Sequence, residues 1–132
     1  MTATTEILKS ITIEASVDLD KLAAAIEALS DTERNTTACA AAMTSGEGDL
    51  AAAVRADLDC VDVCHALRQV LTRATADATM LRGLLESGVA ACERSAAECG
   101  KHAHHHVHCR LCSEGTSATA AACRALLEDL GR

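Results

Sequence analysis

The sequence predicts an all-α protein, an antiparallel up-down-up-down four-helix bundle with an N-terminal arm or short extra helix. Three observations support this fold class. The 132 residues include no Phe, Tyr, Trp or Pro, and alanine is abundant, a composition that favours helix over strand. Apolar or small residues recur every three or four positions along four segments, as on the inward face of a helix. Short connections join the segments and favour antiparallel neighbours.

The first two predicted helices run from Asp18 to Thr44 and from Leu50 to about Arg73. Between them, residues 45–49 (SGEGD) form a turn, and Asp49 is the expected N-cap of the second helix. The inward stripes are Leu22, Ala25, Leu29, Thr32, Thr36, Cys39 and Met43 in the first helix, and Leu50, Ala53, Asp57, Cys60, Cys64, Leu67 and Leu71 in the second.

The third and fourth predicted helices flank the histidine run. A break at residues 74–77 precedes the third helix, Gly100 is the expected helix stop, and the histidines form the corner that leads to the fourth helix. The inward stripes are Leu81, Leu85, Gly88, Cys92, Ser95 and Cys99 in the third helix, and Cys109, Cys112, Thr116, Thr119, Cys123, Leu126 and Leu130 in the fourth.

The length favours one domain, which we predict to comprise an arm at residues 1–17 and a four-helix bundle at residues 18–132. In the arm, ITIEASV (residues 11–17) alternates only weakly between apolar and polar positions. The pattern therefore leaves open whether this region is an extended arm or a short extra helix.

The predicted topology places the cysteines toward one end of the bundle, because the turn at residues 45–49 and the histidine corner lie at the same end. We call this end the mouth. At about 1.5 Å per residue, Cys39, Cys99, Cys109 and Cys112 lie nearest to it, followed by Cys60 and Cys92 and then by Cys64 and Cys123. Leucines line the opposite end. The sequence therefore predicts a core that is half leucine and half thiol.

Charge and segment patterns exclude two classes of partner. The formal net charge is −7 and no Lys/Arg run occurs, which argues against nucleic acid. The N-terminus lacks the pattern of a secretory signal, and no apolar segment is long enough to span a membrane. We therefore expect a cytoplasmic protein, whose cysteines serve as metal ligands or redox thiols rather than as disulfides.

The stretch from Cys92 to Cys112 contains four cysteines and five histidines. Thiolates and imidazoles are preferred by soft and borderline metal ions, and a cavity dominated by thiolates suits Cu(I), Zn(II) or iron–sulfur clusters. The CxxCxxC runs typical of iron–sulfur sites are absent, and there are more thiols than one zinc ion needs. Cu(I) fits best, with Zn(II) as the alternative. The candidate ligands are Cys39, Cys60, Cys64, Cys92, Cys99, Cys109, Cys112, Cys123, His104 and His108.

The histidines have two interpretations. They could receive metal at the mouth and pass it to the cysteines, or form a solvated polar corner; His104 and His108 are the main candidates for the first role. The inward hydroxyls also have two interpretations. Thr and Ser could bond to the preceding helical turn, or they could mark a cavity whose lining has changed from thiol to hydroxyl.

Three segments carry a family resemblance: DLDCVDVC (residues 57–64), AACERSAAECGKHAHHHVHCRLC (residues 90–112) and the terminal AACRALLEDLG. Over roughly residues 18–131 the chain resembles the cytosolic copper storage proteins, which are cysteine-rich four-helix bundles. The resemblance implies that many Cu(I) ions bind thiolates along the core and that copper enters at a histidine-containing mouth. It also implies a homo-oligomer, commonly a tetramer, and we expect a copper chaperone as a further partner.

The chain departs from the family pattern at inward positions. Where the family's ladder usually has cysteine, this chain has Ala25, Leu29, Thr32, Thr36, Met43, Ala53, Gly88, Ser95, Thr116 and Thr119. We therefore predict a non-enzymatic Cu(I)-binding protein of reduced storage capacity. The alternatives are a thiol redox or zinc-binding bundle and a paralogue that has lost its metal function.

Overall fold

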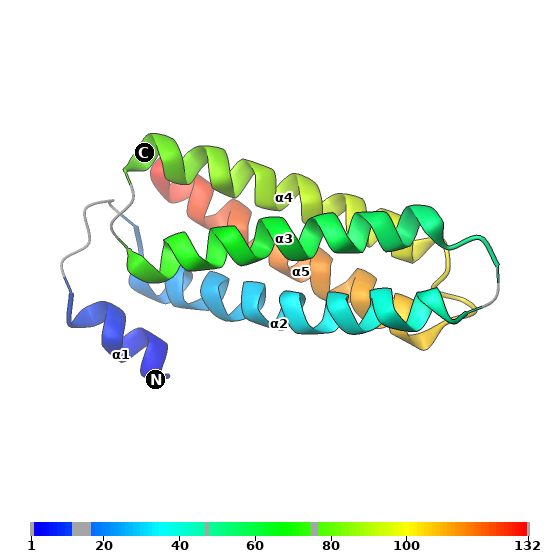
Figure 1. Cartoon of the computed structure of the whole chain (residues 1–132). Coiled ribbons are helices and arrows are strands. Elements are labelled where there is room, and N and C mark those ends of the chain that lie inside the picture. Colours follow the sequence, from blue (N-terminus) through cyan, green and yellow to red (C-terminus); the bar gives the residue numbers. More distant parts are fainter. Residues whose placement is uncertain (1, 12–16, 47, 75–76, 132) are drawn as a thin grey trace.

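The computed structural model describes residues 2–11, 17–46, 48–74 and 77–131. Its helices are α1 (Ala3–Lys9), α2 (Leu19–Thr44), α3 (Ala51–Arg73), α4 (Ala78–Gly100) and α5 (Val107–Leu130), and no strand occurs in these ranges. The four long helices run antiparallel to their neighbours (Figure 1), with α2 and α4 each packed against both α3 and α5. The predicted all-α four-helix bundle is confirmed.

Two of the long helices begin at aspartate caps. The side chain of Asp18 accepts a hydrogen bond from the backbone N–H of Lys21 at 3.0 Å, and Asp77 accepts one from Met80 at 2.9 Å. The prediction for α3 is wrong by one residue, because the cap position belongs to Leu50, whose side chain is buried in the core. Asp49 instead accepts a hydrogen bond from the N–H of Ala51 at 3.3 Å.

The ends of α3 and α4 differ in backbone geometry. Ala74 ends α3 with φ 55°, in the left-handed region that non-glycine residues rarely adopt. The predicted stop at Gly100 is confirmed as the last residue of α4, although the backbone continues right-handed through Lys101. Residues 101–105 then form turns before α5 begins at Val107.

The N-terminal region contains a helix, α1, which packs against α2. Its first turn is capped by Thr2, which accepts a hydrogen bond from the N–H of Thr5 at 3.2 Å. Leu8 is buried and anchors the helix to the leucine-rich end of the bundle. Residues 12–16, which contain most of the weakly alternating segment, lie outside the described residues.

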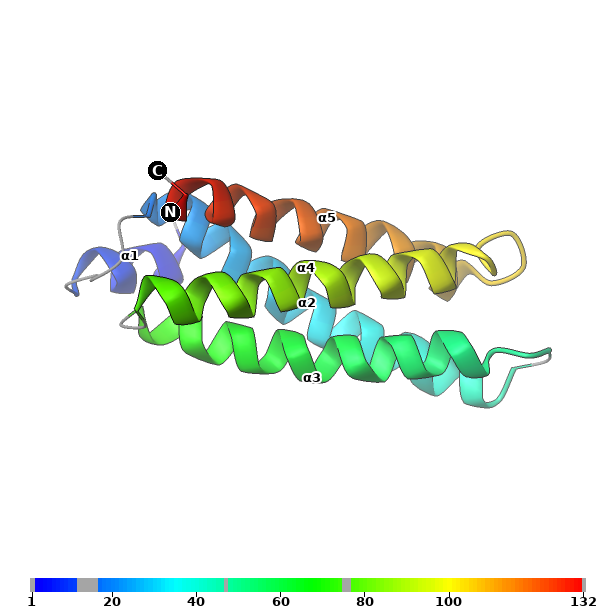
Figure 2. The ribbon, with the colours of Figure 1, turned by 90° about the horizontal axis from the view of Figure 1, so that it is seen from above.

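The predicted inward stripes form the core, with Leu130 partly rather than fully buried. One end contains leucines from all four long helices, and burying each such side chain contributes about 1.5–3 kcal/mol. The α2–α3 and α4–α5 connections lie together at the other end (Figure 2), so the predicted mouth is confirmed. Along the described helices, none is long and apolar enough to cross a membrane.

Candidate metal centre

All eight cysteines are free thiols and all are buried. Three of them form what we call the lower triad: Cys60 and Cys64, one turn apart on α3, and Cys92 on α4. The Sγ–Sγ distances are 3.8 Å for Cys60–Cys64, 3.8 Å for Cys60–Cys92 and 3.6 Å for Cys64–Cys92. The three sulfurs thus form a nearly equilateral triangle in the middle of the bundle.

The three thiols of the lower triad shift one another's pKa values in opposite directions. Hydrogen bonds with Cys64 and Cys92 lower the pKa of Cys60 to about 4. The same bonds raise the pKa of Cys64 and Cys92. Burial raises the pKa of nearby Cys123 to about 11, so its thiol stays protonated near neutral pH. Cys123 packs in the same core, but it does not complete a ligand group with the triad among the described side chains.

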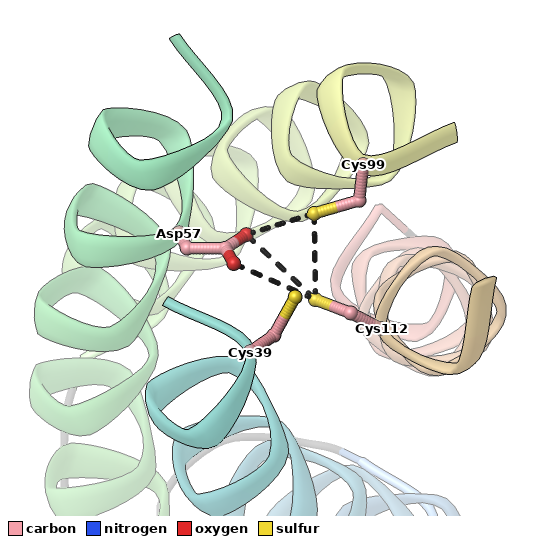
Figure 3. Close-up of side chains that lie close together, drawn as sticks. All are labelled: Cys39, Asp57, Cys99 and Cys112. Atoms are coloured by element: carbon pink, nitrogen blue, oxygen red, sulfur yellow. Dashed lines mark hydrogen bonds between the residues drawn. The ribbon is translucent and has the colours of Figure 1, made fainter. Parts of the chain in front are cut away.

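A second group, which we call the upper cluster, lies closer to the mouth and takes one residue from each long helix: Cys39 from α2, Asp57 from α3, Cys99 from α4 and Cys112 from α5 (Figure 3). Their four ligand atoms all lie within 4.8 Å of one another. The Sγ atoms of Cys99 and Cys112 are 3.7 Å apart, and they lie 3.2 Å and 3.7 Å from Oδ1 of Asp57. Each residue is at most 2 % exposed.

Asp57 was predicted to face inward but was not predicted to be a ligand. Ser95 donates a hydrogen bond to its Oδ1 at 2.7 Å, and Cys99 donates another. Burial is the main reason that the pKa of Asp57 rises to about 6. The sequence signal was a carboxylate three residues before Cys60 on an otherwise apolar or thiol stripe.

Hydrogen bonds shift the pKa values of the upper-cluster thiols in opposite directions. Contacts with Cys39 and Cys99 lower the pKa of Cys112 below its ordinary value. The same network of contacts raises the pKa of Cys39 and Cys99. Cys112 also donates to the carboxylate of Asp57, at 3.7 Å from Oδ1 and 3.9 Å from Oδ2. No Lys or Arg side chain is buried in the described part of the chain, so when these ligands ionise, a bound cation is the source of compensating charge.

The upper cluster continues toward the mouth through a histidine. Nδ1 of His108 lies 3.4 Å from Sγ of Cys39 and 3.5 Å from Sγ of Cys109. The ring of His108 is half-buried and stacks on His106 at a centroid distance of 5.2 Å. Cys39 thus belongs both to the upper cluster and to the ligand group that it forms with His108 and Cys109.

The other predicted mouth histidine lies apart from the thiols. His104 is exposed, and it joins none of the ligand groups found among the described residues. His65, next to Cys64 in sequence, points outward and contacts Glu33 at 2.7 Å on the surface.

Hydroxyl groups occupy inward positions of the core on the α2–α5 side. Oγ1 of Thr32 and Oγ1 of Thr119 share a hydrogen bond of 2.7 Å between α2 and α5. Thr116 donates to the backbone oxygen of Cys112 at 2.9 Å, and Thr119 donates to that of Gly115 at 3.1 Å. Every buried side-chain N or O atom in the described residues has a partner. The predicted bonding of Thr to the preceding helical turn is confirmed for these two residues.

Comparison with known proteins decides the family. The model of the copper storage protein family (Csp) matches residues 18–128. The chain belongs to the copper storage protein family. The resemblance noted in the sequence is thereby confirmed, and the copper storage protein match covers all eight cysteines and the histidine corner.

Solved structures of one member are closely similar. The copper storage protein Ccsp from Streptomyces lividans, loaded with 10 copper equivalents, is 35% identical with a TM-score of 0.91, covering 96% of this chain and 98% of that one. The same cytosolic protein loaded with five coppers is 38% identical with a TM-score of 0.80, covering 83% and 93%. A histidine-to-alanine variant of Ccsp is 38% identical with a TM-score of 0.86, covering 89% and 100%. Among curated proteins, none matches this chain.

Proposed function

We propose that this protein is a cytoplasmic copper store of small capacity that holds Cu(I) through its cysteine thiolates. The observation that carries the proposal is the gathering of buried free thiols into adjacent ligand groups. Thiolates stabilise the soft monovalent ion, and copper-loaded structures of a 35% identical relative support the choice of metal. That relative is described as cytosolic, which supports the location.

The proposed ligands are the cysteines of the lower triad and the upper cluster, with Cys109, Cys123 and His108. His104 is proposed as an outer histidine that meets the ion before His108 does. Because each Cu(I) ion is bound by two or three thiolates, eight thiols hold only a few ions. The function we propose is binding without catalysis.

Three further features complete the proposal. Residues 18–132 form the bundle domain and residues 1–17 an arm. The chain assembles into a homo-oligomer, a tetramer by analogy with its family. A copper chaperone delivers the ion at the mouth, where Val107 and Leu111 are 64% and 54% exposed on the first turns of α5.

A competition titration tests the function. Reduced metal-free protein is titrated with Cu(I) in the presence of a chromogenic Cu(I) chelator, and we expect more than one tightly held copper per chain. The variant with Cys60, Cys64 and Cys92 all changed to Ser should lose part of this copper and keep the rest. Less than one tightly held copper per chain in the unaltered protein would refute the proposal.

The same samples distinguish the rival functions. Elemental analysis reports bound zinc, and free-thiol counts before and after mild oxidation report disulfide formation. A redox protein would lose thiols reversibly under mild oxidation while holding no copper. A metal-free scaffold would show no change in metal content when Cys109 and Cys112 are both replaced by Ser.

A further inference from the structure

The two main ligand groups offer different donor atoms. The lower triad presents three sulfurs, whereas the upper cluster presents three sulfurs and one carboxylate oxygen. We propose that in the copper-free protein the upper cluster binds one divalent ion of the zinc class in tetrahedral geometry, and that the lower triad does not. This inference goes beyond copper storage, and its failure would leave the proposed copper-storage function unaffected.

The geometry of the upper cluster fits a tetrahedron. With Zn–S bonds of about 2.3 Å and a Zn–O bond of about 2.1 Å, the edges of a tetrahedral S₃O site measure about 3.8 Å between sulfurs and about 3.6 Å between sulfur and oxygen. The observed edges are 3.7 Å for Cys99–Cys112, 3.7 Å for Cys112–Asp57 and 3.2 Å for Cys99–Asp57. Of these three edges only the last must lengthen, by a few tenths of an ångström, and the three edges to Cys39 each measure at most 4.8 Å.

The arrangement of the four helices supports the same geometry. Each long helix contributes one ligand, so the donors approach a central point from four sides, as Figure 3 shows. A site built this way is closed by protein on every side, as structural zinc sites are. Ser95 donates a 2.7 Å hydrogen bond to Oδ1 of Asp57, the kind of outer contact that orients metal ligands.

Charge favours a divalent over a monovalent ion in the upper cluster. With all four ligands ionised, the site carries four negative charges, and a divalent ion leaves a net charge of −2 where a monovalent ion leaves −3. The buried side chains of the described residues include no Lys or Arg that could offset the difference. The carboxylate is also a harder ligand than a thiolate, which suits Zn(II) better than Cu(I).

The lower triad lacks the features that a divalent ion needs. Leu67, Leu85 and Cys123 belong to the same core cluster as the triad, and no carboxylate or imidazole among the described residues joins its ligand group. Three sulfurs in a triangle match the low coordination number of Cu(I) with thiolates. The chain therefore contains two sites with different metal preferences, one above the other in the same core.

Co(II) is the probe for the test, because tetrahedral Co(II) bound by thiolates gives strong visible d–d absorption and a sulfur-to-metal charge-transfer band that octahedral Co(II) lacks. Reduced, metal-free full-length protein is titrated with Co(II), and the bound Co(II) is then displaced with Zn(II) to obtain the zinc affinity. We expect one Co(II) per chain with the tetrahedral spectrum, and its loss when one equivalent of Zn(II) is added.

Variants assign the ion to the upper cluster. Asp57→Asn should weaken Zn(II) binding by more than about 100-fold, since even outer contacts of metal ligands are worth about 10–100-fold. Asp57→Cys should restore binding with a stronger charge-transfer band, because it supplies a fourth thiolate. Cys64→Ser, in the lower triad, serves as the matched control and should leave the Co(II) spectrum unchanged.

Three outcomes would overturn the inference. They are an octahedral or absent Co(II) spectrum in the unaltered protein, Zn(II) affinity unaffected by Asp57→Asn, and loss of the spectrum in Cys64→Ser. Circular dichroism checks that each variant is folded, and the Asp57→Cys variant still decides the question if Asp57→Asn fails to fold. A Cu(I) titration of the same variants shows separately whether copper storage holds.

Discussion

Replacing Gly88 by Ala should destabilise the bundle, although alanine is the better helix former. Gly88 is buried in the middle of α4 and faces α3. A Cβ atom added there would lie 2.6 Å from Cδ2 of Leu67, closer than real Cβ contacts. Leu67 is itself 0% exposed, so its side chain must repack within the core rather than move into solvent.

The expected magnitude follows from two opposing effects. Inserting a methyl group into a packed core costs about 1–3 kcal/mol. Replacing a glycine by alanine in a helix interior raises the free energy of unfolding by about 0.8–1.0 kcal/mol. The net loss in the free energy of unfolding is therefore about 1 kcal/mol, with a range of roughly 0–2 kcal/mol. For a domain of this size, that loss corresponds to a fall in Tm of about 3–5 °C.

Gly83 provides the matched control on the same helix. It is exposed, and an added Cβ would meet no atom within 4 Å, so Gly83→Ala should stabilise by about 0.5–1 kcal/mol. Urea unfolding of the reduced, metal-free variants, followed by circular dichroism, measures both changes. If Gly88→Ala proves as stable as Gly83→Ala, the packing argument is wrong.

The same contact limits which side chains position 88 can hold. Leu67 occupies the space that a side chain at position 88 would need. A Cys introduced there would add a sulfur to a Cβ atom that already clashes with Leu67. Adding a thiol ligand at this position should therefore lower the stability of the bundle.

Two further predictions concern titration and metal uptake. The pKa of Asp57 is raised on folding from 3.8 to about 6, so the folded state holds the proton more tightly and the free energy of unfolding falls as pH rises between about 4 and 6. Relative to Asp57→Asn, the reduced metal-free protein should lose up to about 3 kcal/mol across this interval, measured from urea unfolding midpoints. Parallel pH profiles of the two proteins would contradict this prediction. His108→Ala should slow Cu(I) uptake in stopped-flow experiments without changing the final copper count of the lower triad, because the thiols that His108 contacts are Cys39 and Cys109, which lie outside the triad. An uptake rate equal to that of the unaltered protein would show that His108 is not on the entry route.

The helices and their inward faces could be predicted because they depend on local patterns. The spacing of three and four residues identified every fully buried cysteine, and the aspartate caps at residues 18 and 77 sit where a helix start needs a side-chain acceptor. The start of α3 was missed because burial of Leu50, a tertiary effect, shifts the cap by one residue. The left-handed turn at Ala74 carries no glycine signal.

The grouping of the ligands could not be predicted to the same extent. Periodicity tells which face a residue occupies, but separations between side chains on different helices depend on how the helices are rotated against one another. Thus Cys99 and Cys112 were expected near the mouth, whereas their contact with Asp57 emerges only in three dimensions. His104 and His108 look equivalent in sequence, yet only His108 reaches the thiols, because it lies in the first turn of α5.

The hydroxyl residues indicate how the bundle can hold metal without depending on it. A thiol-lined core that needed metal to compensate its polar groups would unfold on release, as small zinc domains do. In this chain Thr32, Thr116 and Thr119 bond to one another or to helix backbone, and leucines from all four long helices pack together in the core. The metal-free bundle therefore has satisfied polar groups and an intact apolar core. Loading and release can then proceed on a folded scaffold, which is what a reversible metal store requires.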